Sequence, residues 1–227
     1  MKIPEHTSNT FDAELTTACE KVMRMAELVE NQFSVAISSL ASADLAAMDS
    51  VMDMGYLVNA MEIEIDELCT SILVRRQPTA NDLRLVTTII KIINDLERVG
   101  DEAENVVKYS RLIFQKNLQQ LPCYSQINYI SDVAGKMLSA AMSAFEEMDA
   151  EIAREMAHKD ALIDQECRSI LRGLIGYMME DGSDLTVAMQ VGLISRSVER
   201  IGDHAKNISE YVVYMIQGRR AQNYCTI

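Results

Sequence analysis

The 227-residue chain has no tryptophan, and aromatic residues make up only 5% of it. It contains 3 prolines and 9 glycines, so the residues that punctuate turns in sheet-rich proteins are scarce. The apolar residues are instead mostly aliphatic, with many Ala, Leu, Ile and Val and 15 Met. This mixture is typical of packed helices, and it predicts an all-α protein.

The chain also has little positive charge and no long apolar run. Its net charge of −13 repels phosphate backbones, so we expect no nucleic-acid partner. No segment approaches the ~20 uninterrupted apolar residues of a spanning helix, so we expect no direct membrane insertion. The amino terminus does not resemble a secretory signal, and the 5 cysteines have no paired spacing. These features predict a cytoplasmic protein.

Apolar residues recur at three- and four-residue spacing, and the prolines fall where this pattern breaks. The pattern predicts six helices, over about 11–40, 45 or 51–76, 83–116, 124–148, 152–179 and 185–216. Asp44 is expected to cap the second helix, Asn81 or Asp82 the third, and Ser183 or Asp184 the sixth. Pro122 divides the chain, so we expect one three-helix bundle in residues 1–120 and another in residues 121–227.

The two halves share sequence as well as helix order. The segment E-R-V-G-D-E-A-E-N-V begins at Glu97, and E-R-I-G-D-H-A-K-N-I begins at Glu199. Six of the ten positions are identical, and two more exchange Val for Ile. We therefore infer an internal duplication of a three-helix unit.

In the second copy, Glu199 and Asp203 are one helical turn apart, and so are Asp160 and Asp164 on the preceding helix. Counting residues from the turn near Gly182 puts the two pairs at the same height in an antiparallel hairpin. Four carboxylates are then expected to converge. Oxygen ligands of this kind suit Mg, Mn, Ca or non-haem iron better than a metal that prefers thiolates.

In the first copy, the same count puts Glu97 and Asp101 level with Asn59, and Glu62 completes the expected site. Gly55 stands where the second copy has Asp160, and we expect Glu62 or Asp66 to supply the missing carboxylate. Both motifs also contain a glycine, Gly100 and Gly202, at a cost of about 1 kcal/mol relative to Ala within a helix. We expect a backbone or a ligand to approach closely at these glycines.

The acidic motifs admit two rival interpretations. Glu-Arg neighbours on helices usually form ion pairs, so the chain could be a metal-free helical scaffold. A carboxylate-bridged di-iron, ferritin-like site is less well supported, because it needs two E-x-x-H motifs and the chain has one, from Glu155 to His158. No phosphate-binding loop or nucleophile motif is visible, so we expect no enzyme. His204 is expected at the surface or an edge, and Cys69 and Cys167 in the core.

The paired E-R-[VI]-G-D-x-x-x-N motifs, together with RRQPTANDLRLV before the first copy and GYMMED before the second, resemble the PhoU family. This resemblance implies two tandem three-helix bundles and a cytoplasmic, often dimeric protein without enzymatic activity. It also implies negative regulation of phosphate uptake, as an adaptor between a phosphate ABC transporter and a sensor histidine kinase. The motifs of the family can hold metal clusters, so we expect divalent or trivalent ions such as Mg, Mn, Fe or Zn. The expected ligands are Glu97, Asp101, Asn59, Glu62, Glu199, Asp203, Asp160 and Asp164.

Overall fold

The computed structural model describes residues 9–114, 121–180 and 184–218, and this part of the chain is entirely helical apart from short turns. Its helices are α1 (Asn9–Ser42), α2 (Leu45–Arg76), α3 (Ala80–Phe114), α4 (Tyr124–Glu147), α5 (Ala150–Met178) and α6 (Leu185–Gln217). The expected fold class is confirmed, and each helix lies within a few residues of its expected range. None of the described helices is long and apolar enough to cross a membrane.

Aspartate side chains cap the first turns of three described helices, α2, α5 and α6. Asp44 accepts hydrogen bonds from the backbone N–H groups of Ala46 and Ala47, and Asp184 does the same at the start of α6. The third helix differs from expectation, because it begins at Ala80, before both expected caps. Asp82 instead lies in the first turn of α3, where a carboxylate interacts favourably with the helix dipole.

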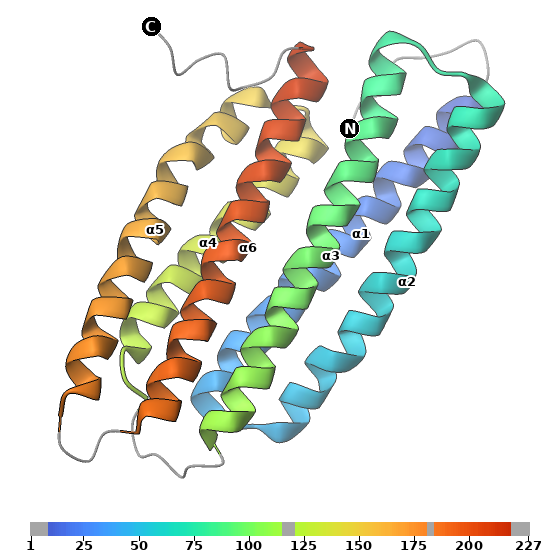
Figure 1. Cartoon of the computed structure of the whole chain (residues 1–227). Helices are drawn as coiled ribbons and strands as arrows, with labels where there is room; N and C mark the ends of the chain where they lie inside the picture. Colours follow the sequence, from blue (N-terminus) through green and yellow to red (C-terminus); the bar gives the residue numbers. More distant parts are fainter. Residues whose placement is uncertain (1–8, 115–120, 181–183, 219–227) are drawn as a thin grey trace, which may run out of the picture.

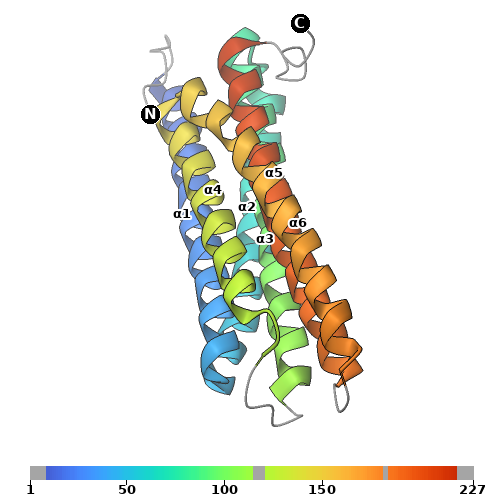
Figure 2. The same cartoon turned by 90° about the vertical axis from the view of Figure 1, so that its left-hand side faces the viewer.

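The helices form two layers (Figures 1 and 2). One layer contains α5, α6, α3 and α2 in that order, and the other contains α4 and α1. Within each half of the chain, three consecutive helices pack against one another as a bundle. The two bundles meet along α3 and α6, and also where α1 lies beside α4.

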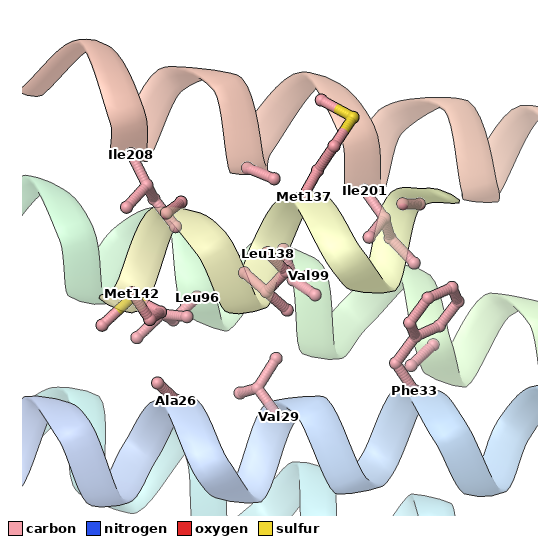
Figure 3. Packing of buried hydrophobic residues seen from close by; sticks show 14 of the residues in the cluster. Ala26, Val29, Phe33, Leu96, Val99, Met137, Leu138, Met142, Ile201 and Ile208 are labelled. Carbon is pink, nitrogen blue, oxygen red and sulfur yellow. The ribbon is translucent and has the colours of Figure 1, made fainter. Parts of the chain in front are cut away.

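The helices α3 and α6 run antiparallel, as the contacts of Asp95 with His204 and of Glu102 with Arg200 show. Buried apolar residues form one cluster that includes all six helices of the described chain. In Figure 3, Val29 of α1, Val99 of α3, Leu138 of α4 and Ile201 of α6 point into the same space between the bundles. The hydrophobic core therefore continues from one half of the molecule to the other.

The duplication is also visible in the pattern of burial. Val99 and Ile201 are both fully buried, as are the next equivalent pair, Ala103 and Ala205. Because equivalent residues of α3 and α6 are buried in the same way, the two motifs have the same orientation in their bundles. Asp101 and Asp203 consequently face outward, whereas Glu102 and His204, the next residues along each motif, are buried.

Candidate metal centre

Three carboxylates come together between α5 and α6. Asp160 and Asp164 lie one turn apart on α5, and Asp203 lies opposite them on α6. One oxygen from each of these three residues lies within 4.8 Å of the others. Asp160 is buried, Asp164 is half-buried and Asp203 is exposed, so the acidic triad of Asp160, Asp164 and Asp203 opens to solvent on one side.

Glu199, the fourth expected ligand of this half, lies beside the triad but has a partner of its own. Its Oε2 atom is 2.6 Å from an Nη atom of Arg196, one turn earlier on α6. Its charge still reaches Asp203, because Glu199 adds to the effect of burial in raising the pKa of that residue. Glu199 is therefore a neighbour of the triad rather than part of its tight cluster.

The carboxylates of the triad and Glu199 repel one another. Although Asp203 is exposed on one side, partial burial of its carboxyl raises the pKa, and the charges of Asp160, Glu199 and Asp164 raise it further, while Arg196 acts in the opposite direction. Lys206 relieves part of this repulsion, since its Nζ atom is 2.5 Å from Oδ2 of Asp160. This hydrogen bond raises the pKa of Lys206, so its ammonium group remains charged beside the triad.

The residues expected in the first half do not form a comparable cluster within the described part of the chain. Glu97 and Glu62 are half-buried, whereas Asp101 and Asn59 are exposed. Burial raises the pKa of Glu97, followed by the charges of Asp101 and Glu62, so these carboxylates are near enough to interact. The first half thus gathers acidic charge more loosely than the second.

Glu104 occupies the space above Gly55, which sequence reasoning did not foresee. A Cβ atom at Gly55 would lie 1.9 Å from Oε1 of Glu104. Glu104, which also pairs with Lys108 at 3.0 Å, therefore brings a carboxylate to Gly55, while the expected part of Glu62 or Asp66 in the site stays a prediction. The duplication could have indicated this contact. Gly55 corresponds to Asp160 and Glu104 corresponds to Lys206, and Asp160 and Lys206 are partners in the second half.

The atoms that come nearest to the motif glycines belong to side chains rather than to the expected backbone. A Cβ atom at Gly202 would lie 2.9 Å from Cδ1 of Ile163, and one at Gly100 would lie 3.0 Å from Oε1 of Gln32. Gln32 comes from α1 and is fully buried. Each glycine therefore allows a neighbouring helix to place a side chain against the motif helix.

The expected surface position of His204 is wrong. This residue is only 8% exposed, and its Nδ1 atom is 2.6 Å from Oδ1 of the buried Asp95 on α3. Burial, followed by the charge of Asp95 and a hydrogen bond with it, raises the pKa of the Tyr211 phenol to about 12. Residues on the α3 side of α6 are covered by the other bundle, which a helical count within one half does not reveal.

Cys69 and Cys167 are buried, as expected of core residues. Burial raises the pKa of the Cys69 thiol to about 12 and that of Cys167 to about 11. Neither thiol is therefore prepared to act as a thiolate ligand near neutral pH.

Comparison with known proteins identifies the family. The PhoU domain model matches residues 22–110 and 127–212. The chain belongs to the PhoU family. Each matched segment contains one copy of the E-x-x-x-D motif, so the PhoU domain corresponds to the duplicated unit.

Curated PhoU relatives match most of the chain. It is 39% identical over 95% of its length to a phosphate-specific transport system accessory protein PhoU homolog of Pseudomonas putida, covering 84% of that protein. It is 36% identical to the phosphate-specific transport system accessory protein PhoU of Escherichia coli K12, over 96% of this chain and 90% of the relative.

Solved PhoU structures share the fold. The crystal structure of PhoU from Pseudomonas aeruginosa matches with a TM-score of 0.88 and 38% identity, over 92% of this chain and 100% of that one. PhoU from Streptococcus pneumoniae, described as a phosphate transport system regulatory protein, matches with a TM-score of 0.84 and 27% identity. That match covers 93% of this chain and 99% of the other.

The donor set of this PhoU protein fits a hard cation. The triad offers only carboxylate oxygens, which suit Mg, Mn or Fe, whereas Zn sites in proteins usually include His or Cys. A cation at the triad would offset the repulsion that adds to burial in raising the pKa of Asp203. Of the one E-x-x-H motif considered for a di-iron site of the ferritin type, Glu155 is exposed, and the side chain of His158 lies outside the described residues.

Proposed function

We propose that this PhoU protein is an accessory protein of phosphate-specific transport that restrains phosphate uptake and represses phosphate-starvation signalling. The proposal rests on its similarity to the phosphate-specific transport system accessory proteins of Pseudomonas and Escherichia along almost the whole chain. It acts as an adaptor between a phosphate ABC transporter and a sensor histidine kinase. It works in the cytoplasm, as a homodimer and without enzymatic activity.

Metal binding is the second part of the proposal. The acidic triad binds a divalent or trivalent cation, with Glu199 as a neighbouring carboxylate that could join it if Arg196 turns away. The observation that carries this assignment is the approach of three carboxylate oxygens to within 4.8 Å, in a copy of a motif that the chain contains twice. The first half binds more weakly, because its acidic residues are more dispersed.

An in vivo experiment tests the signalling role. Deleting the gene in the native host should leave phosphate-starvation promoters active at high phosphate, measured with a reporter fused to such a promoter. Complementation with the wild-type chain should restore repression. Normal repression in the deletion strain, with no second PhoU gene present, would rule out the adaptor role.

Metal analysis separates the metal-binding protein from a metal-free scaffold. Protein purified without chelator should contain metal by elemental mass spectrometry, and Asp203→Ala should lose most of it. Glu199→Ala should lose less, because Arg196 already occupies that carboxylate. Asp132→Ala serves as a control, since Asp132 is an exposed carboxylate of α4 paired with Lys136. Absence of metal from every variant, with unchanged stability, would leave the scaffold as the explanation.

A further inference from the structure

An apolar face lies at the end of the α5–α6 hairpin, beyond the acidic triad. It consists of three side chains along α5 and its C-terminal end and three along α6, spaced four residues apart in each row. Each is more than a third exposed: Leu171, Ile175, Met179, Leu185, Met189 and Leu193. Met179 is 84% exposed and Met189 is 64% exposed. Isolated apolar residues are normal on a protein surface, but a contiguous patch marks a site of association.

The six side chains form two rows at matching heights. Leu171 lies against α6, since its Cδ2 atom is 3.7 Å from the position of a Cβ on Gly192. In this register Leu171 is level with Leu193, and Ile175 is level with Met189. The rows also share a side with the triad, because Asp164 and Leu171 are seven residues, or two turns, apart on α5. The apolar face therefore extends the groove that contains the triad.

The first half of the chain keeps only the outer end of this face, where the exposed Val74 and Leu83 correspond to Met179 and Leu185. Helix α2 aligns with α5 when Val58 is matched to Ile163, and both are buried. The central four positions of the apolar face then correspond to polar residues of the first half: Asp66, Thr70, Thr87 and Lys91. Because both hairpins have the same fold, the fold alone does not require apolar residues here.

Charge around the apolar face is arranged in two opposite groups. Arg168 and Arg172 lie at its inner end on α5, and both are exposed. Glu180 is exposed just after Met179, at its outer end. Although the whole chain has a net charge of −13, residues 168–196 include three Arg and three acidic residues and so have no net charge. Two copies of the protein would thus meet here without the repulsion expected elsewhere on the surface.

We propose that this face binds the same face of a second copy, with the hairpins antiparallel about a twofold axis at the level of Ile175 and Met189. In this arrangement Ile175 meets Ile175 of the partner subunit, and Arg172 lies beside Glu180 of the partner subunit. The rows and their flanking charges extend for about 18 Å along the helices and across two helix diameters. The four helices then bury both apolar faces as a four-helix bundle does.

Self-complementarity distinguishes a second copy from other occupants. A lipid surface would match the apolar residues, but it would provide no acidic partner arranged in the same order as Glu180. The inference rests on the homodimer proposed above and specifies the surface that forms it.

Sedimentation equilibrium of the full chain tests the inference. Ile175→Asp should raise the dimer dissociation constant at least tenfold while circular dichroism remains helical. Ile63→Asp is the matched control, because Ile63 on α2 is 57% exposed and Ile175 is 55% exposed. The control should leave the dissociation constant unchanged.

A charge exchange tests the antiparallel arrangement. Arg172→Glu and Glu180→Arg should each weaken the dimer, and the double variant should restore it, because the two residues meet across the twofold axis. Ile175→Cys should form a disulfide-linked dimer on mild oxidation, while Thr70→Cys on the first hairpin should not.

Each opposite outcome overturns the inference. If Ile175→Asp leaves the dimer dissociation constant unchanged, the dimer forms through another surface. The proposed homodimer is then retained, but this face is not its interface. A double charge variant no tighter than the single variants excludes the antiparallel arrangement. A wild-type monomer overturns both proposals, and loss of phosphatidylglycerol vesicle binding in Ile175→Asp would then assign the face to lipid.

Discussion

At the residue scale, the acidic residues around the triad are partly neutralised, by a raised pKa and by neighbouring cations. Asp203 has a raised pKa because burial and three neighbouring carboxylates disfavour its ionised form. Lys206 and Arg196 each bind one carboxylate of the group, Asp160 and Glu199 respectively. The protein therefore supplies two cations of its own to a site that is also suited to a metal ion.

Asp203→Asn should stabilise the metal-free protein. A carboxyl with a raised pKa in the folded state favours folding at low pH, and this contribution is lost as the pH rises through the folded pKa. The variant should therefore gain about 2 °C in Tm relative to wild type near pH 7 in EDTA, and less near pH 4. Thermal unfolding followed by circular dichroism measures this difference. If the gain in Tm were larger at acid pH than at pH 7, repulsion and burial of the ionised Asp203 carboxylate would not be the cause of its raised pKa.

The contact between His204 and Asp95 should matter more than an exposed ion pair of equal length. His204→Ala leaves Asp95 buried with one partner fewer, which should cost about 3 kcal/mol in the free energy of unfolding. Lys136→Ala breaks a 2.6 Å pair with Asp132 on the surface of α4 and should cost less than about 0.5 kcal/mol. Urea denaturation measures the free energy of unfolding of the two variants. Equal losses would show that burial does not make the His204–Asp95 contact more stabilising than the surface pair.

At the scale of helices, apolar periodicity and capping residues predicted most boundaries, because both act locally. Asp44 and Asp184 cap the helices that follow them. The position of Glu104 above Gly55 and the burial of His204 could not be predicted in this way. They depend on which faces of α2, α3 and α6 meet, and that is decided by packing between helices rather than within one.

Alanine substitutions at two glycines should have opposite effects. Gly176 lies in α5 with no atom within 4 Å of a Cβ position, so Gly176→Ala should stabilise the protein by about 0.5 kcal/mol or more. Gly202→Ala should instead lower stability by about 1 kcal/mol, because the new Cβ would crowd Ile163. Chemical denaturation of both variants tests the pair. Stabilisation by Gly202→Ala would mean that Ile163 moves aside freely.

At the scale of the whole molecule, the two bundles share a core. The helix order and the duplication predicted two units, and the boundary near residue 120 stays a prediction. The sequence did not reveal how closely the units join, because the apolar side chains that meet between bundles follow the same periodicity as those inside one bundle. Val99 and Ile201 illustrate this, since each belongs to a motif helix and both point between the bundles.

The shared core predicts cooperative unfolding. Val99→Ala should lower the stability of the whole chain by about 2 kcal/mol, because it removes buried volume beside both bundles. Far-ultraviolet circular dichroism and tyrosine fluorescence should give one coincident transition in urea for wild type and variant alike. Two separate transitions, only one of which shifts, would show that the bundles unfold independently.

The antiparallel contact of α3 with α6 has a consequence for the origin of the chain. A repeated unit whose equivalent helices face each other across a pseudo-twofold axis has the geometry of two identical short chains in a symmetric pair. After fusion of the two genes, the sequences of the two halves would no longer have to be identical. The divergence of Gly55 and Glu104 from Asp160 and Lys206 is a change that only a fused, asymmetric descendant could keep.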